Sequence, residues 1–139
     1  GVDADAAVAV TEANLADMIE FAKSCAQSCG SVIAITGAID LVADAEVCYV
    51  IRNGRKEMSS ITGTGCQLSG VMTAFLAANP GYALAAAAAA VAAMGLAGEI
   101  AMEYMTEGDG NATYRNRIID ALYHITAERM NRGERIEIR

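Results

Sequence analysis

The sequence has few basic residues and little histidine. It holds ten Lys and Arg against seventeen Asp and Glu, which gives a formal net charge of −7, and it has one histidine. Nucleic acids and anionic membrane surfaces bind clustered Lys and Arg, and the ten here are scattered, so we expect neither as a partner. The four cysteines, at positions 25, 29, 48 and 66, form no paired C-x-x-C units. We therefore predict no zinc site and no disulfide framework, and a reducing, cytoplasmic setting fits.

Charge is absent from residues 82–98, whose centre is the alanine run 85–90. This run is slightly shorter than the roughly 20 residues that a bilayer requires, and alanine contributes little transfer energy. We expect a buried helix rather than a membrane span, with small residues that allow close approach to a sheet or to another helix. Glu99, Glu103 and Glu107 mark where this helix emerges from the core.

The 139 residues, 54% of them hydrophobic, suffice for a single domain over residues 1–139. Helical and extended patterns alternate, which predicts an α/β layer structure. The expected strands are 31–36, covered on both faces, 46–52, which enters an Asn53-Gly54 hairpin, and an edge piece at 135–138. The expected helices are one from an N-cap at Thr11 to Gly30, then 67–78, 84–105 and 114–130, the last capped by Thr113.

A glycine-rich turn, Gly63-Thr64-Gly65-Cys66, leads directly into the apolar helical stretch 67–76. Two glycines allow the backbone to turn its N–H groups into a concave nest, and the helix behind adds the positive end of its dipole. We therefore predict that an anion binds at Gly63, Thr64 and Gly65. The same field favours a thiolate at Cys66, so a reactive group and an anion site coincide.

Other chemistry for these residues stays open. A cysteine beside oxyanion-binding N–H groups could perform acyl transfer, but His124 is the sole imidazole that could serve as its base, and nothing in the sequence ties it to Cys66. Cys25 and Cys29 lie four apart on a helix without further ligands nearby, so we interpret them as ordinary thiols. A further alternative is that the chain is a non-catalytic nucleotide-binding or assembly module.

Several sequence blocks together resemble the C-terminal half of the hydroxyethylthiazole kinases, a family of the ribokinase-like superfamily. The blocks are Gly1-Val2-Asp3, Val32–Gly37, Asp40–Asp44, Ile61–Cys66 and Met94–Glu99. They cover nearly the whole chain in the order of the family. The Gly-Thr-Gly-Cys element is the specific part, because most ribokinase-like enzymes carry Asp at the position of Cys66.

The resemblance implies the C-terminal portion of a three-layer α/β/α fold and a thiamin-salvage kinase. Such an enzyme transfers the γ-phosphoryl group of ATP, with Mg²⁺, to the primary alcohol of 4-methyl-5-(2-hydroxyethyl)thiazole. It further implies that Thr36 contacts ATP, that Gly63, Thr64 and Gly65 bind phosphate, and that the substrate lies near Gly63. Cys66 then takes the catalytic position, where it orients or deprotonates the attacking hydroxyl.

The resemblance covers only part of the family's length. The thiazole pocket, the acidic residues around Mg²⁺ and a basic ATP contact belong to the part that precedes these blocks. We therefore expect the isolated chain to be inactive or nearly so. We also expect it to associate with a complementary N-terminal half, or as the homotrimer that the resemblance implies for the complete enzyme.

Overall fold

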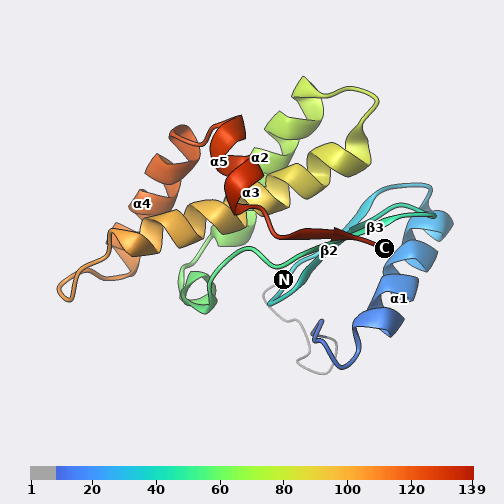
Figure 1. The fold of residues 1–139 in the computed structure, drawn as a ribbon, viewed down its shortest axis with the longest axis horizontal. Coiled ribbons are helices and arrows are strands. Elements are labelled where there is room, and N and C mark those ends of the chain that lie inside the picture. The colour runs from blue at the N-terminus through green and yellow to red at the C-terminus, as the bar shows by residue number, and fades with distance from the viewer. Residues whose placement is uncertain (1–8) are drawn as a thin grey trace.

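The structure, a computed structural model, describes residues 9–139, so the Gly1-Val2-Asp3 block lies outside the described part. The helices are α1 (Leu15–Cys29), the 3-10 helix η2 (Lys56–Ser60), α2 (Thr64–Ala78), α3 (Ala83–Glu103), α4 (Asn111–Tyr123) and α5 (Ala127–Gly133). The strands are β1 (Ile33–Ile35), β2 (Asp40–Ala43), β3 (Cys48–Ile51) and β4 (Ile136–Ile138). In Figure 1, α1 lies on one side of the sheet and the other α-helices lie on the opposite side.

The sheet is antiparallel throughout, in the order β1-β2-β3-β4. Side chains alternate between its two faces, as the pleat requires. Leu41 of β2 packs toward α1, whereas its neighbour Val42 packs toward α3. Both central strands are therefore covered on both sides, which confirms the predicted α/β layers.

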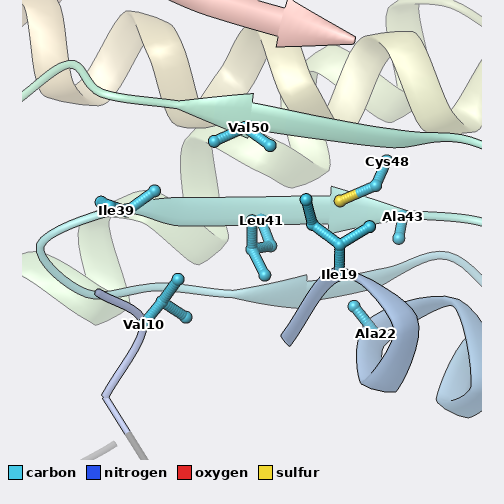
Figure 2. Packing of buried hydrophobic residues seen from close by; sticks show 8 residues of the cluster. All are labelled: Val10, Ile19, Ala22, Ile39, Leu41, Ala43, Cys48 and Val50. Carbon is cyan, nitrogen blue, oxygen red and sulfur yellow. The ribbon is translucent and has the colours of Figure 1, made fainter. Parts of the chain in front are cut away.

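Three apolar clusters form the core. The first fills the space between α1 and the sheet, and Figure 2 shows how Ile19 and Ala22 of α1 lie over Leu41, Cys48 and Val50. The second joins the other face of the sheet to α3. The third lies between α3, α4 and the chain that precedes α2.

The first strand is shorter and less covered than its sequence predicts. Only residues 33–35 of the expected strand 31–36 are extended, and Ala34 is exposed. The prediction that both faces are covered is wrong for β1, because β1 is an edge strand. The prediction also missed β2, although Leu41-Val42-Ala43 is fully buried.

The Asn53-Gly54 hairpin is not formed. β3 pairs with β2 and β4, and the chain continues from Gly54 into η2 instead of returning as a strand. Asn53 is 5% exposed; its Nδ2 donates to the Gly133 carbonyl at 2.8 Å and its Oδ1 accepts from the Arg135 N–H at 2.7 Å. These long-range bonds give the asparagine a structural role that outweighs the local turn preference.

Two predicted helix starts are wrong. Thr11 does not cap α1; its N–H and hydroxyl both donate to Asn14 Oδ1, and the helix begins at Leu15. Thr113 lies inside α4 rather than at its start, and the expected helix 114–130 is divided in two. Thr126 causes this division, because its side chain accepts the N–H of Arg129 and so caps the separate helix α5. Two other predictions are confirmed: Gly30 is the C-cap residue of α1, and the last extended segment forms the edge strand β4.

The helix α3 is the buried helix that the uncharged run predicts. It is long and apolar enough to cross a bilayer by length and composition, and 67% of its apolar window is buried inside the molecule. Glu103 and Glu107 are exposed, as expected. Glu99 is partly buried instead, because its Oε1 accepts the Gly54 N–H at 2.6 Å and it pairs with Arg135.

Close approach between α3 and the chain after β3 depends on glycine. A Cβ atom built on Gly95 would lie 2.6 Å from the carbonyl carbon of Asn53. One built on Gly98 would overlap the sulfur of Met58. Packing thus explains the two glycines of the block Met94–Glu99, because they let the segment 53–61 lie directly on α3.

Replacing Gly95 by alanine should destabilise the protein by about 1–3 kcal/mol, because backbone atoms of Asn53 would have to move. Gly70→Ala is the matched control, since Gly70 lies inside α2 and nothing lies within 4 Å of an added Cβ. That change should stabilise by up to about 1 kcal/mol through helix propensity. Urea titrations measure both, and a Gly95→Ala protein as stable as the wild type would contradict the packing argument.

The pH dependence of stability should carry a contribution from Asp40. Burial raises the pKa of this carboxyl from 3.8 to about 6, and a hydrogen bond from the Gly37 N–H offsets only part of that rise. The unfolded chain releases this proton near its ordinary pKa, so the folded state binds more protons between about pH 4 and 6. Stability from this group therefore falls as the pH rises through that window, by about 1–3 kcal/mol.

Urea unfolding at several pH values tests this contribution. Asp40→Asn should flatten the pH dependence of the unfolding free energy between about pH 4 and 6 relative to the wild type. Asp44→Asn is the control of opposite sign, because the N–H groups of Val47 and Glu46 lower the pKa of the Asp44 carboxyl. Equal slopes for the wild type and Asp40→Asn would show that Asp40 titrates normally in the folded protein.

Candidate functional site

The Gly-Thr-Gly-Cys turn is the beginning of α2, three residues earlier than predicted. Gly63 is the N-cap residue with φ 95°, a left-handed conformation that favours glycine, and its carbonyl accepts the Gln67 N–H at 2.9 Å. Thr64, Gly65 and Cys66 form the first helical turn, where N–H groups lack intrahelical acceptors. No backbone acceptor contacts these three N–H groups within residues 9–139. The turn therefore offers a row of donors at the positive end of a 15-residue helix.

The chain before this turn is anchored on three sides. Ile61 is 5% exposed and packs with Met94 and Ala97 of α3. The carbonyl of Ser60 accepts a hydrogen bond from the Asn111 side chain at 3.0 Å. Since Met58 also lies against Gly98, the segment that leads into the turn is held by α3 and α4.

Cys66 has an exposed thiol on the first turn of α2. Its neighbour Gln67 presents a different feature, because the Oε1 atom of Gln67 is buried and has no hydrogen-bond partner among the described residues. No sequence pattern indicates this open acceptor, since only tertiary packing decides which side-chain atoms are covered. The start of α2 thus includes an exposed cysteine and, at Gln67, a buried carbonyl oxygen without a partner among the described residues.

Thr36 lies in a second segment, the β1–β2 turn. It directly follows β1 and is exposed, so its hydroxyl faces no competing core contact. The strand register puts this turn at the end of the sheet where β3 leaves toward η2. Figure 1 shows the same arrangement, with the β1–β2 turn and the chain that leads to α2 at one end of the sheet. No hydrogen bond within the described chain joins Thr36 to the start of α2.

Asp40 is a residue of this turn that sequence reasoning left without a role. Its Oδ1 accepts the Gly37 N–H at 2.8 Å, and burial raises its pKa to about 6. At neutral pH the group is therefore mostly ionised, but in a setting that penalises the charge. The spacing of Gly37 and Asp40, three residues apart between two extended segments, is the sequence feature that could have indicated this side-chain bond.

The remaining sequence candidates are not brought to this site. His124 is the C-cap residue of α4 and packs edge-on against Tyr123, with ring centroids 5.0 Å apart. It lines a hollow of about 400 Å³ between α3, α4 and α5, together with Tyr104 and Arg117. That hollow contains no residue of the Gly-Thr-Gly-Cys turn, so His124 and Cys66 do not share it.

A magnesium site is not supplied by the described residues alone. Within residues 9–139, no group of three or more His, Cys, Asp or Glu side chains could hold a metal ion. Cys25 is partly buried and Cys29 is exposed, and all four cysteines are free. The predicted site residues instead offer backbone N–H groups at the start of α2 and the Thr36 hydroxyl, donors that suit an anion.

Comparisons with known proteins agree on one family. Residues 1–128 match the sequence model of the hydroxyethylthiazole kinase family. A hydroxyethylthiazole kinase from Clostridium acetobutylicum is 44% identical over 137 residues, which are 99% of this chain and 50% of that protein. The one from Arabidopsis thaliana is 45% identical over 107 residues, 77% of this chain and 38% of that protein.

A solved structure gives the same result. The hydroxyethylthiazole kinase of Pyrococcus horikoshii OT3 superposes with a TM-score of 0.82 at 25% identity, covering 92% of this chain and 48% of that one. This chain spans about half the length of the curated relatives that it matches. By sequence over nearly its whole length, and by the course of its backbone, the chain belongs to the hydroxyethylthiazole kinase family.

Proposed function

We propose that this chain is the phosphate-binding half of an ATP-dependent kinase for the primary alcohol of 4-methyl-5-(2-hydroxyethyl)thiazole. The observation that carries the proposal is the donor row at the start of α2, in a chain whose relatives are named hydroxyethylthiazole kinase. Phosphoryl transfer asks a protein mainly to position the reactants and to stabilise charge on the phosphoryl oxygens. A backbone nest at a helix N-terminus suits that task.

Each predicted site residue has a role in this proposal. The N–H groups of Thr64 and Gly65 bind phosphoryl oxygens, and Gly63 allows the backbone to approach the substrate closely. Thr36 donates its hydroxyl to a phosphate of ATP. Mg²⁺ supplies charge neutralisation when bound, and carboxylates outside the described residues hold it. The free cysteines agree with a reducing, cytoplasmic setting.

Cys66 orients the attacking hydroxyl and accepts its proton only in part. Sulfur is a weak hydrogen-bond acceptor, so its contribution should be modest beside that of the backbone donors. The exposed thiol is accessible to a substrate hydroxyl that lies over the first turn of α2. The alternative acyl-transfer chemistry is not favoured, since His124 lines the hollow between α3, α4 and α5, which contains no residue of the Gly-Thr-Gly-Cys turn.

Association with further polypeptide fits the exposed apolar surface. Within the described chain, α2 has no fully buried residue, although its sequence is strongly apolar. β1 also leaves one edge of the sheet unpaired among the described strands. Such surfaces are normally covered by another chain or segment. A complementary N-terminal half would cover them, and a homotrimer is the assembly that we propose for the complete enzyme.

The first experiment measures ADP release from MgATP and the thiazole alcohol. It compares this chain alone with a mixture that also contains the N-terminal half of the Clostridium acetobutylicum relative. That relative is chosen because it is 44% identical to this chain over the 137 aligned residues. Activity is expected only in the mixture, because each half supplies part of the site. Robust turnover by the chain alone would overturn the two-half proposal. A folded mixture without turnover would favour a non-catalytic nucleotide-binding or assembly module.

The role of Cys66 is tested in the active mixture. Cys66→Ala should lower kcat by about 10- to 100-fold, at or below the usual range for a general base, because the backbone donors remain. Cys66→Asp should retain more activity, since a carboxylate is the better acceptor. Cys29→Ala is the matched control, an exposed thiol at the end of α1, and should leave kcat unchanged. Complete loss in a normally folded Cys66→Ala protein would show that the thiol is indispensable.

A further inference from the structure

We propose that Asp40 is a positioning residue that fixes the Thr36–Gly37 turn so that the Thr36 hydroxyl faces a nucleotide phosphate. This inference rests on the proposed function, in which Thr36 contacts ATP. It adds a residue whose part in the site follows from contacts in this structure. Asp40 itself does not touch the nucleotide in this proposal.

The turn has one anchored end and one exposed end. Ile35 pairs with Leu41 across the two strands, and residues 36–39 make the connection between β1 and β2, which begins at Asp40. At the anchored end, Ile39 is 8% exposed in the core and Asp40 pairs with Ile51 of β3. At the exposed end, Thr36 and Gly37 have no core contact to hold them.

The bond from the Gly37 N–H to Asp40 Oδ1 joins these two ends. At 2.8 Å it is short for an N–H donor, as expected for an acceptor that carries charge. No Lys or Arg forms an ion pair with Asp40 within the described residues, so the carboxylate is free to serve the turn alone. The Gly37 N–H is directed at Asp40, whereas the exposed Thr36 hydroxyl has no hydrogen-bond partner among the described residues and is available to a phosphate.

A second aspartate, Asp44, directly follows β2 and provides a matched comparison. Asp44 Oδ1 accepts the N–H groups of Glu46 and Val47 at 2.8 and 2.7 Å, and so holds the β2–β3 turn. It lies four residues after Asp40, directly beyond the opposite end of β2, about 13 Å away. Both aspartates therefore hold turns, but only Asp40 holds the turn that contains Thr36.

The test measures steady-state kinetics in the mixture with the complementary N-terminal half. Asp40→Ala should raise KM for ATP about 10-fold, the effect of one lost hydrogen bond, while KM for the thiazole alcohol stays within about twofold. Asp40→Asn keeps an acceptor oxygen and should stay within about threefold of the wild type. Asp44→Ala should change neither KM. Equal ATP KM values for the wild type and Asp40→Ala would overturn the inference.

A double-mutant cycle with Thr36→Val separates positioning from a general structural effect. If Asp40 acts through the Thr36 hydroxyl, Asp40→Ala should add little to the ATP KM of Thr36→Val. Fully additive effects would contradict that pathway. Amide exchange of Gly37, followed by NMR, should be faster in Asp40→Ala than in Asp40→Asn, and equal protection would show that the bond does not hold the turn.

The outcomes also separate this inference from the proposed function. A wild-type mixture without ATP-dependent turnover would overturn the proposed function, and the inference with it. Wild-type turnover with an unaltered ATP KM in Asp40→Ala would overturn only the role of Asp40.

Discussion

The contact between α3 and the segment 53–61 is the constraint on which the rest of the structure depends. Gly95 lets the backbone of Asn53 lie directly on the helix, where a Cβ atom would come within 2.6 Å of it. Glu99, one helical turn further, then receives the Gly54 N–H. From this contact the chain runs through η2 to Ile61 and into the Gly-Thr-Gly-Cys turn. Any outward movement of the segment would therefore move the candidate site as well.

The same contact ties the end of the chain to the site. Asn53 binds both Gly133 and Arg135, and Arg135 forms a bidentate pair with Glu99. A buried polar network is stabilising only when its members are satisfied, and the Asn53 side chain uses both its donor and its acceptor here. Hydrogen bonds thus hold the segment that leads into β4 against Asn53 and α3. By contrast, α2 has no buried residue and β1 leaves an unpaired edge among the described strands.

The candidate site is built mainly from backbone, which decides how much of it the sequence can predict. Gly63 and Gly65 predict a donor row before a helix because glycine spacing acts locally, and the structure has α2 begin there. Asp40 was not predicted, although its bond to Gly37 is equally local, because an aspartate in a strand turn has many possible partners. The open acceptor of Gln67 was beyond sequence reasoning, since it depends on which neighbours bury that atom.

By itself the sequence determined the α/β layering, the buried alanine-rich helix and the glycine turn. Each of these follows from interactions between residues close in the chain, or from hydrophobic pattern alone. Only the tertiary structure decided that Asn53-Gly54 would not form a hairpin and that β1 would lie at an edge. In these cases the residues could adopt several local conformations, and contacts with residues distant in sequence selected one of them. Buried backbone and side-chain groups must also form hydrogen bonds, which few of those conformations allow.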